Sequence, residues 1–353
     1  MPSLPSAAMR RLPLLLLSIV SLALTAPAAI ADGGGVGFGG GGAPGPGVPQ
    51  QPQKAGPGKT LVGIADQTGS TFSDPLFADL GVKHARLNLA WDALDYDWQV
   101  AELDDWMARA NAAGVQPLVV FSQSRVQGRT RILPTPAQYG EMVTRLRARY
   151  PFLNEFAGWN EMNYPGQPTF KRPGMVAQYY KVLRTTCPTC RVLPGSLLDN
   201  PNLVPWTKQL LKAIKKLRQP TPTTWGLHNY SDVNRLRDTS TKKLLKVVKG
   251  KVWLTETGGV VRATSPTASR YPQGAAFAGK VTAYILGTLT KKNPRIERTY
   301  LYEWKAPQGN VSWDSGLVSP EDATRPAYEI VKTYVRTGKV PFVKGQGGKT
   351  RRR

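Results

Sequence analysis

The stretch PAQYGEMVTRLRARYPFLNEFAGWNE, residues 136–161, joins an amphipathic segment to a short apolar run that closes on polar residues. We expect the amphipathic part, 136–149, to form a helix and the apolar part, 156–160, to form a strand. The same order recurs along the chain, where apolar or β-branched runs alternate with amphipathic stretches. This alternation is typical of a parallel sheet whose strands are connected by helices.

Eight such strand and helix pairs can be counted. The expected strands lie near residues 61–65, 84–89, 116–121, 156–160, 191–195, 224–229, 251–255 and 299–304. The expected helices lie near residues 75–80, 101–113, 136–149, 174–185, 206–217, 233–248, 275–290 and 326–336. Eight units in this length favour a closed α/β barrel, the (β/α)8 or TIM barrel, over an open doubly wound sheet.

The first residues have the pattern of a signal peptide. Arg10 and Arg11 precede a continuous apolar run over residues 12–24. The Ala-Ile-Ala of residues 29–31 fits the small residues of a cleavage site, so we assign 1–31 as the signal peptide. The run is shorter than the roughly 20 residues that span a bilayer. We therefore expect a secreted or cell-envelope-associated protein without a transmembrane segment.

The rest of the chain divides by composition. Residues 32–58 are rich in Gly, Pro and Gln, and we expect a disordered linker there. A single barrel domain is expected over 59–341. The last residues, 342–353, are expected to form a basic disordered tail. We expect the protein to be a monomer.

The chain carries a formal net charge of +24. Loss of residues 1–31 would lower it to +22, because that segment holds two arginines and no acidic residue. Such a charge could attract an anionic cell-envelope polymer or an acidic membrane, or it could be a solvated surface without a partner. Nucleic-acid binding is not expected, because no recognised nucleic-acid motif is present and a signal peptide directs the chain elsewhere.

Cys187 and Cys190 are the only cysteines and have the spacing C-x-x-C. In the cytosol this spacing would suggest redox or zinc chemistry. In an exported chain two such cysteines more often form a local structural disulfide, and the pair lies just before an expected strand. We favour the disulfide.

Two of the expected strands are followed directly by a glutamate. Glu161 follows the fourth strand and Glu256 follows the seventh. The chemistry of a (β/α)8 barrel lies at the C-terminal ends of its strands, and strands four and seven face each other across the ring. Two facing carboxyl groups suit the cleavage of a glycosidic bond, in which one protonates the leaving oxygen and the other attacks the anomeric carbon. Either glutamate alone could instead be a surface charge on a loop.

At these positions the sequence resembles the clan A glycoside hydrolases, in particular families 5 and 39. Residues 159–161, Trp-Asn-Glu, are similar to the strand-four motif of the clan, and residues 255–258, Thr-Glu-Thr-Gly, to its strand-seven motif. The resemblance implies a retaining glycosidase acting by double displacement on a polysaccharide or oligosaccharide. It implies that Glu161 is the acid/base, Glu256 the nucleophile and Asn160 a ligand of the sugar 2-hydroxyl.

The resemblance extends to three further strands. Arg86 and Trp91 resemble the strand-two arginine and the aromatic residue after it. His228 and Tyr230 resemble the strand-six pair, whose tyrosine hydrogen-bonds the nucleophile. Trp304 stands where the clan has a tryptophan that floors the catalytic subsite. Strand alternation would then turn Tyr302 inward with Trp304, and Glu303 outward toward the helices.

Two alternative functions are disfavoured. A non-catalytic barrel that binds cell-envelope polysaccharide would not need both carboxylates together with their supporting Arg and Tyr. A metal-dependent hydrolase would need a cluster of ligands, yet His84 and His228 are the only histidines. We therefore expect no metal and no cofactor. His84 is expected at the bottom of the barrel, and Trp225 in the core, whereas Trp313 could line the cleft.

Overall fold

The computed structural model of the protein describes residues 60–266, 268–309 and 311–341. The predicted signal peptide, linker and basic tail, 1–31, 32–58 and 342–353, lie outside the described residues. Within these described ranges, no helix is long and apolar enough to cross a membrane.

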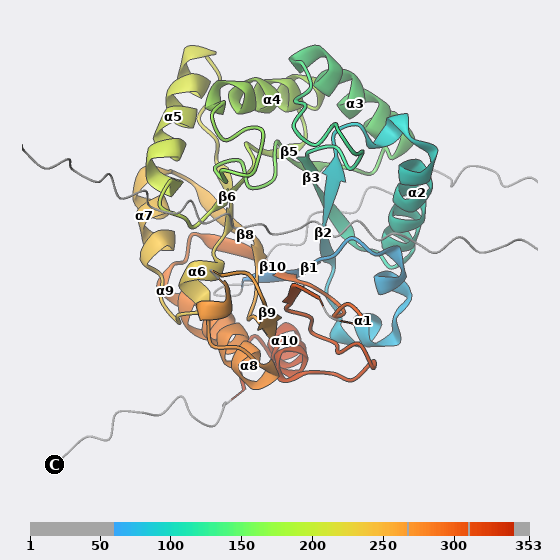
Figure 1. Cartoon of the computed structure of the whole chain (residues 1–353), viewed down its shortest axis with the longest axis vertical. Coiled ribbons are helices and arrows are strands. Elements are labelled where there is room, and N and C mark those ends of the chain that lie inside the picture. Colours follow the sequence, from blue (N-terminus) through green and yellow to red (C-terminus); the bar gives the residue numbers. More distant parts are fainter. Residues whose placement is uncertain (1–59, 267, 310, 342–353) are drawn as a thin grey trace, which may run out of the picture.

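Parallel strands form the centre of the domain (Figure 1). Their bounds are β1 Leu61–Ala65, β2 His84–Ala90, β3 Gln116–Ser122, β4 Glu155–Ala157, β5 Arg191–Leu193, β6 Ser196–Leu198, β7 Thr224–His228, β8 Lys251–Thr257 and β10 Ile296–Tyr302. They are hydrogen-bonded in the order β5-β4-β3-β2-β1-β10-β8-β7-β6. A separate antiparallel pair consists of β9 Arg262–Ala263 and β11 Trp313–Asp314.

The ring closes through β5 and β6, which are two segments of one barrel strand. β5 pairs with β4 and β6 pairs with β7, and only Pro194 and Gly195 separate them. Gly195 has a φ of +151°, and a Cβ there would lie 2.5 Å from the carbonyl oxygen of Trp159. A glycine is therefore required where this strand bends past its neighbour. The nine segments thus make the predicted eight-stranded barrel.

Helices surround the strands (Figure 1). Their bounds are α1 Pro75–Leu80, α2 Asp97–Ala112, α3 Pro136–Arg149, α4 Pro173–Thr186, α5 Leu203–Lys216, α6 Tyr230–Val233, α7 Thr239–Val247, α8 Ala275–Tyr284, α9 Thr290–Lys292 and α10 Pro326–Thr337. The helix predicted over 233–248 is interrupted, because Asp232 accepts hydrogen bonds from the backbone N–H and hydroxyl of Thr241 and so folds the chain between α6 and α7. The helix predicted over 275–290 continues from α8 through a π-helical segment, Ile285–Leu289, into α9.

The start of α3 illustrates how the sequence sets these boundaries. Thr135 accepts a hydrogen bond from the backbone of Gln138, whose side chain accepts one from the backbone of Thr135. This reciprocal capping satisfies N–H groups that have no partner inside the helix, and Pro136 follows at the first helical position. The side chain of Tyr139 is fully buried, so the face of α3 that carries it packs toward the barrel.

Side chains fill the interior of the barrel. Its apolar part is formed by Ala65, Leu118, Val120, Ala157, Leu193, Trp253 and Tyr300. Below it, Arg298 donates two hydrogen bonds to the buried Glu155. His84 is buried nearby, and burial together with the charge of Arg298 lowers the pKa of its imidazole to about 3. The predicted position of His84 in the barrel bottom is confirmed, as is the burial of Trp225.

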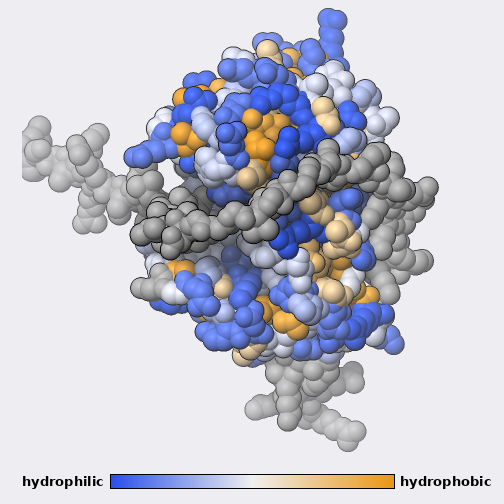
Figure 2. Space-filling view, turned by 90° about the vertical axis from the view of Figure 1, so that its right-hand side faces the viewer, coloured by the Kyte–Doolittle hydropathy of each residue, from blue (hydrophilic) through white to orange (hydrophobic). Residues whose placement is uncertain are grey.

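A disulfide joins Cys187 and Cys190 between the end of α4 and the start of β5, which confirms the predicted local bond. The face seen in Figure 2 is mainly hydrophilic where grey atoms do not cover it, and its hydrophobic areas are small and separate.

Candidate active site

Four barrel strands bring their charged or polar residues to one point at the C-terminal end of the barrel. Arg86 lies in β2, Glu161 follows β4, His228 ends β7 and Glu256 lies in β8. Arg86 and His228 are almost fully buried, and Glu161 is 6% exposed. Glu161 also has a φ of +46°, a conformation that is uncommon for residues other than glycine and that clusters at functional sites.

Both carboxylate oxygens of Glu256 are held by hydrogen bonds. Nη1 of Arg86 donates to Oε2 at 2.9 Å, and the hydroxyl of Tyr230 donates to Oε1 at 3.1 Å. Nη2 of Arg86 also donates to Oδ1 of Asn160 at 2.5 Å. The guanidinium group therefore fixes two of the predicted site residues relative to each other. The predicted meeting of Arg86, Tyr230 and Glu256 is present in the structure.

Glu161 lies in a different environment. Its burial raises the pKa of the carboxyl group to about 7, and the charge of Arg86 offsets only part of that effect. Nδ1 of His228 lies 3.1 Å from Oε1 of Glu161. Burial lowers the pKa of His228 to about 3, so this imidazole is neutral and contributes a hydrogen bond rather than a charge. Glu161 can therefore exist as the protonated acid near neutral pH.

The two glutamates are close enough to act on one bond. One ligand atom each of Glu161, His228 and Glu256 lies within 4.8 Å of the others. The carboxyl groups are about 5–5.5 Å apart in retaining glycosidases and about 6.5–9.5 Å apart in inverting ones, so the close spacing matches the retaining geometry. The same three side chains could serve as ligands of a divalent cation. The guanidinium of Arg86 already places a positive charge beside Glu256.

The structure overturns the prediction for Trp304. Its side chain is 1% exposed, its Nε1 donates to Asp74, and its ring packs against Phe77 of α1 and Tyr328 of α10. It therefore belongs to the layer between barrel and helices and cannot floor a sugar site. Strand alternation failed here because β10 ends at Tyr302.

Tyr302 is the aromatic side chain of β10 that lies beside the site. It packs against the apolar interior of the barrel and remains partly exposed. Burial raises the pKa of its hydroxyl strongly, and the carboxyl groups of Glu303 and Glu256 add to that effect. The inward direction that strand alternation predicts for Tyr302 is therefore confirmed.

Glu303 also departs from its prediction. The carboxyl group does not pair with the helix layer but lies among loops at the C-terminal end of the strands, near Asp66, Asp314 and the backbone of Ser315. Burial and the charge of Asp66 raise its pKa to about 8. Among the described residues, its Oε1 has no hydrogen-bond partner.

Trp91 and Trp313 are two further aromatic residues that the sequence analysis singled out. Trp91, which resembles the aromatic residue after the strand-two arginine, is only 5% exposed, and the guanidinium of Arg129 lies over its ring at 5.6 Å. Trp313 is half-buried, and its ring packs edge-on against that of Tyr230 at 5.1 Å. This contact places Trp313 beside the residue that holds Glu256.

No protein-family model matches the chain, and no curated protein matches its sequence. Solved structures do match. A family 39 glycoside hydrolase from the gut symbiont Bacteroides cellulosilyticus WH2 aligns with 82% of this chain and 66% of its own, at 15% identity and a TM-score of 0.52. The chain shares the barrel fold of this glycoside hydrolase.

Two further structures support the same assignment of fold. A family 5, subfamily 18 glycoside hydrolase from Streptomyces cattleya aligns with 79% of this chain and 80% of its own, at 17% identity and a TM-score of 0.55. A β-glucosidase from Thermotoga maritima aligns with 82% of this chain and all of its own, at 11% identity and a TM-score of 0.57. The predicted (β/α)8 barrel and its resemblance to families 5 and 39 are confirmed at the level of the fold.

Proposed function

We propose that the protein is a retaining glycosidase that cleaves O-glycosidic bonds in a polysaccharide or oligosaccharide outside the cytoplasm. One observation carries the proposal. Two carboxyl groups at the C-terminal end of the barrel lie close together in unlike environments, Glu161 buried beside a neutral imidazole and Glu256 held by Arg86 and Tyr230. Such a difference assigns one group to proton transfer and the other to attack.

In the first step, the protonated Glu161 gives its proton to the glycosidic oxygen while a carboxylate oxygen of Glu256 attacks the anomeric carbon. The bond to the leaving oxygen breaks, and a glycosyl ester forms on Glu256. The raised pKa of Glu161 supports this role, because it keeps the acid protonated near neutral pH.

In the second step, Glu161 is a carboxylate and accepts a proton from water, whose oxygen attacks the anomeric carbon. The bond to Glu256 breaks and the carboxylate is regenerated. Arg86 and Tyr230 hold the two oxygens of Glu256 in position for both steps. Asn160 accepts from Arg86 through Oδ1, which leaves its Nδ2 to donate to a substrate hydroxyl.

A panel of polysaccharides tests the proposal. β-Glucans, xylans, mannans and bacterial exopolysaccharides are incubated with the protein, and newly formed reducing ends are measured. We expect at least one to be cleaved, and both Glu161→Ala and Glu256→Ala to abolish that cleavage. Glu141→Ala is the matched control, because Glu141 is an exposed glutamate on α3. Full activity of Glu256→Ala, or no cleavage of any polymer by the unmodified protein, would contradict the proposal.

A further inference from the structure

Eight exposed cations lie on one flank of the barrel. Five belong to α5 and the turn after it, namely Lys208, Lys212, Lys215, Lys216 and Arg218. Three belong to α7 and the segment after it, namely Lys243, Lys246 and Lys249. The two helices pack against each other and lie on the same side of the barrel in Figure 1. We call this surface the α5–α7 cationic face.

Acidic side chains do not neutralise this face. Residues 203–231 and 239–255 contain no Asp or Glu. In the part of the chain that the structure describes, none of the eight cations lies within 4.0 Å of a carboxylate oxygen. Surface arginines of α2 and α3 differ, because they are paired: Arg109 with Asp105, Arg145 with Asp95 and Arg149 with Asp104. The cations of the α5–α7 cationic face are therefore uncompensated, whereas these three arginines of α2 and α3 are not.

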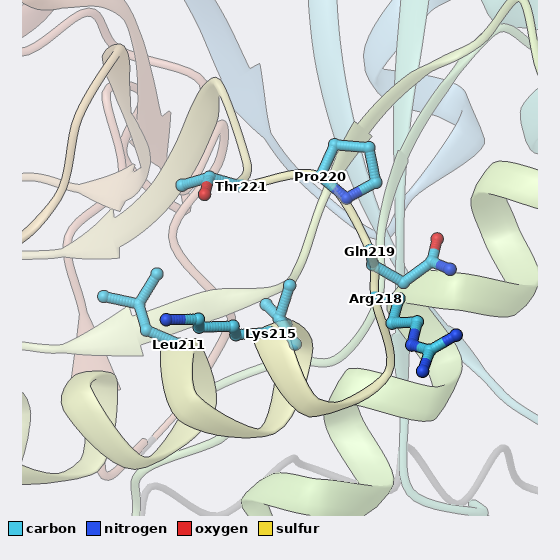
Figure 3. A pocket seen from close by; sticks show the side chains of 7 residues that line it. Leu211, Lys215, Arg218, Gln219, Pro220 and Thr221 are labelled. Carbon is cyan, nitrogen blue, oxygen red and sulfur yellow. The ribbon is translucent and has the colours of Figure 1, made fainter.

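A groove of about 560 Å³ opens within the cationic face, at the end of α5 (Figure 3). Lys215 and Arg218 line it, next to the apolar side chains of Leu211, Ile214 and Pro220. A sugar ring has apolar C–H faces, and an acidic sugar also carries a negative charge. The combination of apolar wall and cations suits such a unit, because ligand sites commonly pair apolar contact with a few polar groups.

The groove is remote from the candidate catalytic residues. α5 leads into the N-terminal end of β7, whereas His228, beside Glu161, ends that strand. The groove and the carboxylates therefore lie at opposite ends of the barrel. A polymer bound on this face would leave the mouth of the barrel open.

We propose that the α5–α7 cationic face binds a linear acidic glycan, a polysaccharide whose sugar units carry carboxylate or phosphate groups. Single exposed ion pairs contribute little to binding. Several contacts along one polymer reinforce one another, so cations spread over two neighbouring helices favour a partner with repeated negative charge. The sugar units fit the apolar part of the groove, and the charges fit its cations.

Equilibrium binding of the full chain to polygalacturonate and to poly(N-acetylglucosamine 1-phosphate), a linear polymer of phosphate-linked sugars, tests the proposal at low ionic strength. The variant Lys212→Gln/Lys215→Gln/Lys246→Gln should bind about tenfold more weakly, since three exposed ion pairs are lost. The control variant Lys83→Gln/Arg270→Gln/Lys339→Gln removes the same charge at exposed positions elsewhere and should bind within about twofold of the unmodified protein. An equal loss in the two variants would assign the binding to net charge and overturn the proposal.

Other polymers make the test specific. The tighter binder of the two acidic polymers identifies carboxylate or phosphate as the recognised group, and failure of both to bind overturns the proposal. Double-stranded DNA should bind more weakly than the preferred glycan. Equal or tighter binding of DNA would contradict the assignment to a glycan. Because binding is measured rather than cleavage, the outcome is separate from that of the proposed hydrolysis.

Discussion

The burial of Glu161 leads to a prediction that can be tested without a substrate. Burial raises the pKa of this carboxyl group from an ordinary 4.5 to about 7. A carboxyl group whose pKa is higher in the folded protein has no effect on the free energy of unfolding below pH 4.5. As the pH rises toward 7 it lowers the free energy of unfolding, because the folded state must then keep the proton or bury the charge. At about 1.4 kcal/mol for each pH unit, the cost reaches about 3 kcal/mol above pH 7.

The variant Glu161→Gln removes this cost, because glutamine has nearly the same shape and does not ionise. We expect the free energy of unfolding of the variant, relative to the unmodified protein, to increase by about 3 kcal/mol between pH 4 and pH 8. Denaturant unfolding at both pH values measures the change. Glu141→Gln, at an exposed position, should show almost none. A difference for Glu161→Gln that does not vary with pH would refute the assignment of a buried acid.

The remaining predictions concern activity and packing. If Glu161 is the acid, kcat/KM on a cleaved substrate should fall about tenfold for each pH unit above 7, since the protonated fraction falls in proportion; a flat profile would contradict this role. Tyr230→Phe removes a hydrogen bond to Glu256 and should lower kcat by about 10–100-fold, because bonds to charged groups contribute about 1.5–3 kcal/mol; an unchanged kcat would show that the contact is dispensable. Trp304→Ala should destabilise the fold by about 3–5 kcal/mol in denaturant unfolding, as expected for a buried aromatic, whereas a loss of less than 1 kcal/mol would contradict its buried position. Thr135→Ala removes the cap of α3 and should cost about 1 kcal/mol in the same assay, and no loss would argue against the capping box.

Periodicity was sufficient to predict the barrel. Each expected strand has a counterpart, because strand patterns depend on nearby residues and on burial from both sides. The fifth expected strand, 191–195, covers only the first of two segments, and the second, β6, follows Gly195, which closely approaches Trp159. That contact joins residues distant in sequence, so local pattern could not reveal it.

The carboxylates were predictable for a similar reason. Glu256 lies near the end of β8 and Glu161 follows the end of β4 by four residues, and barrel geometry places such strand ends together. The direction of a side chain beyond the end of a strand was not predictable in this way. Trp304 and Glu303 follow the last residue of β10, where alternation no longer decides direction, and tertiary contacts such as that of Trp304 with Asp74 decide it instead.

Covalent trapping tests the central claim most directly. The protein is incubated with a 2-deoxy-2-fluoro glycosyl fluoride of the sugar that the panel identifies, which slows release of the glycosyl ester, and is then digested with trypsin. Cleavage after Lys251 and Arg262 gives a peptide, 252–262, whose only acidic side chain is Glu256. The account predicts the added sugar mass on that peptide. Sugar mass on the peptide that carries Glu161, or an active protein that forms no adduct and releases the inverted anomer, would contradict it.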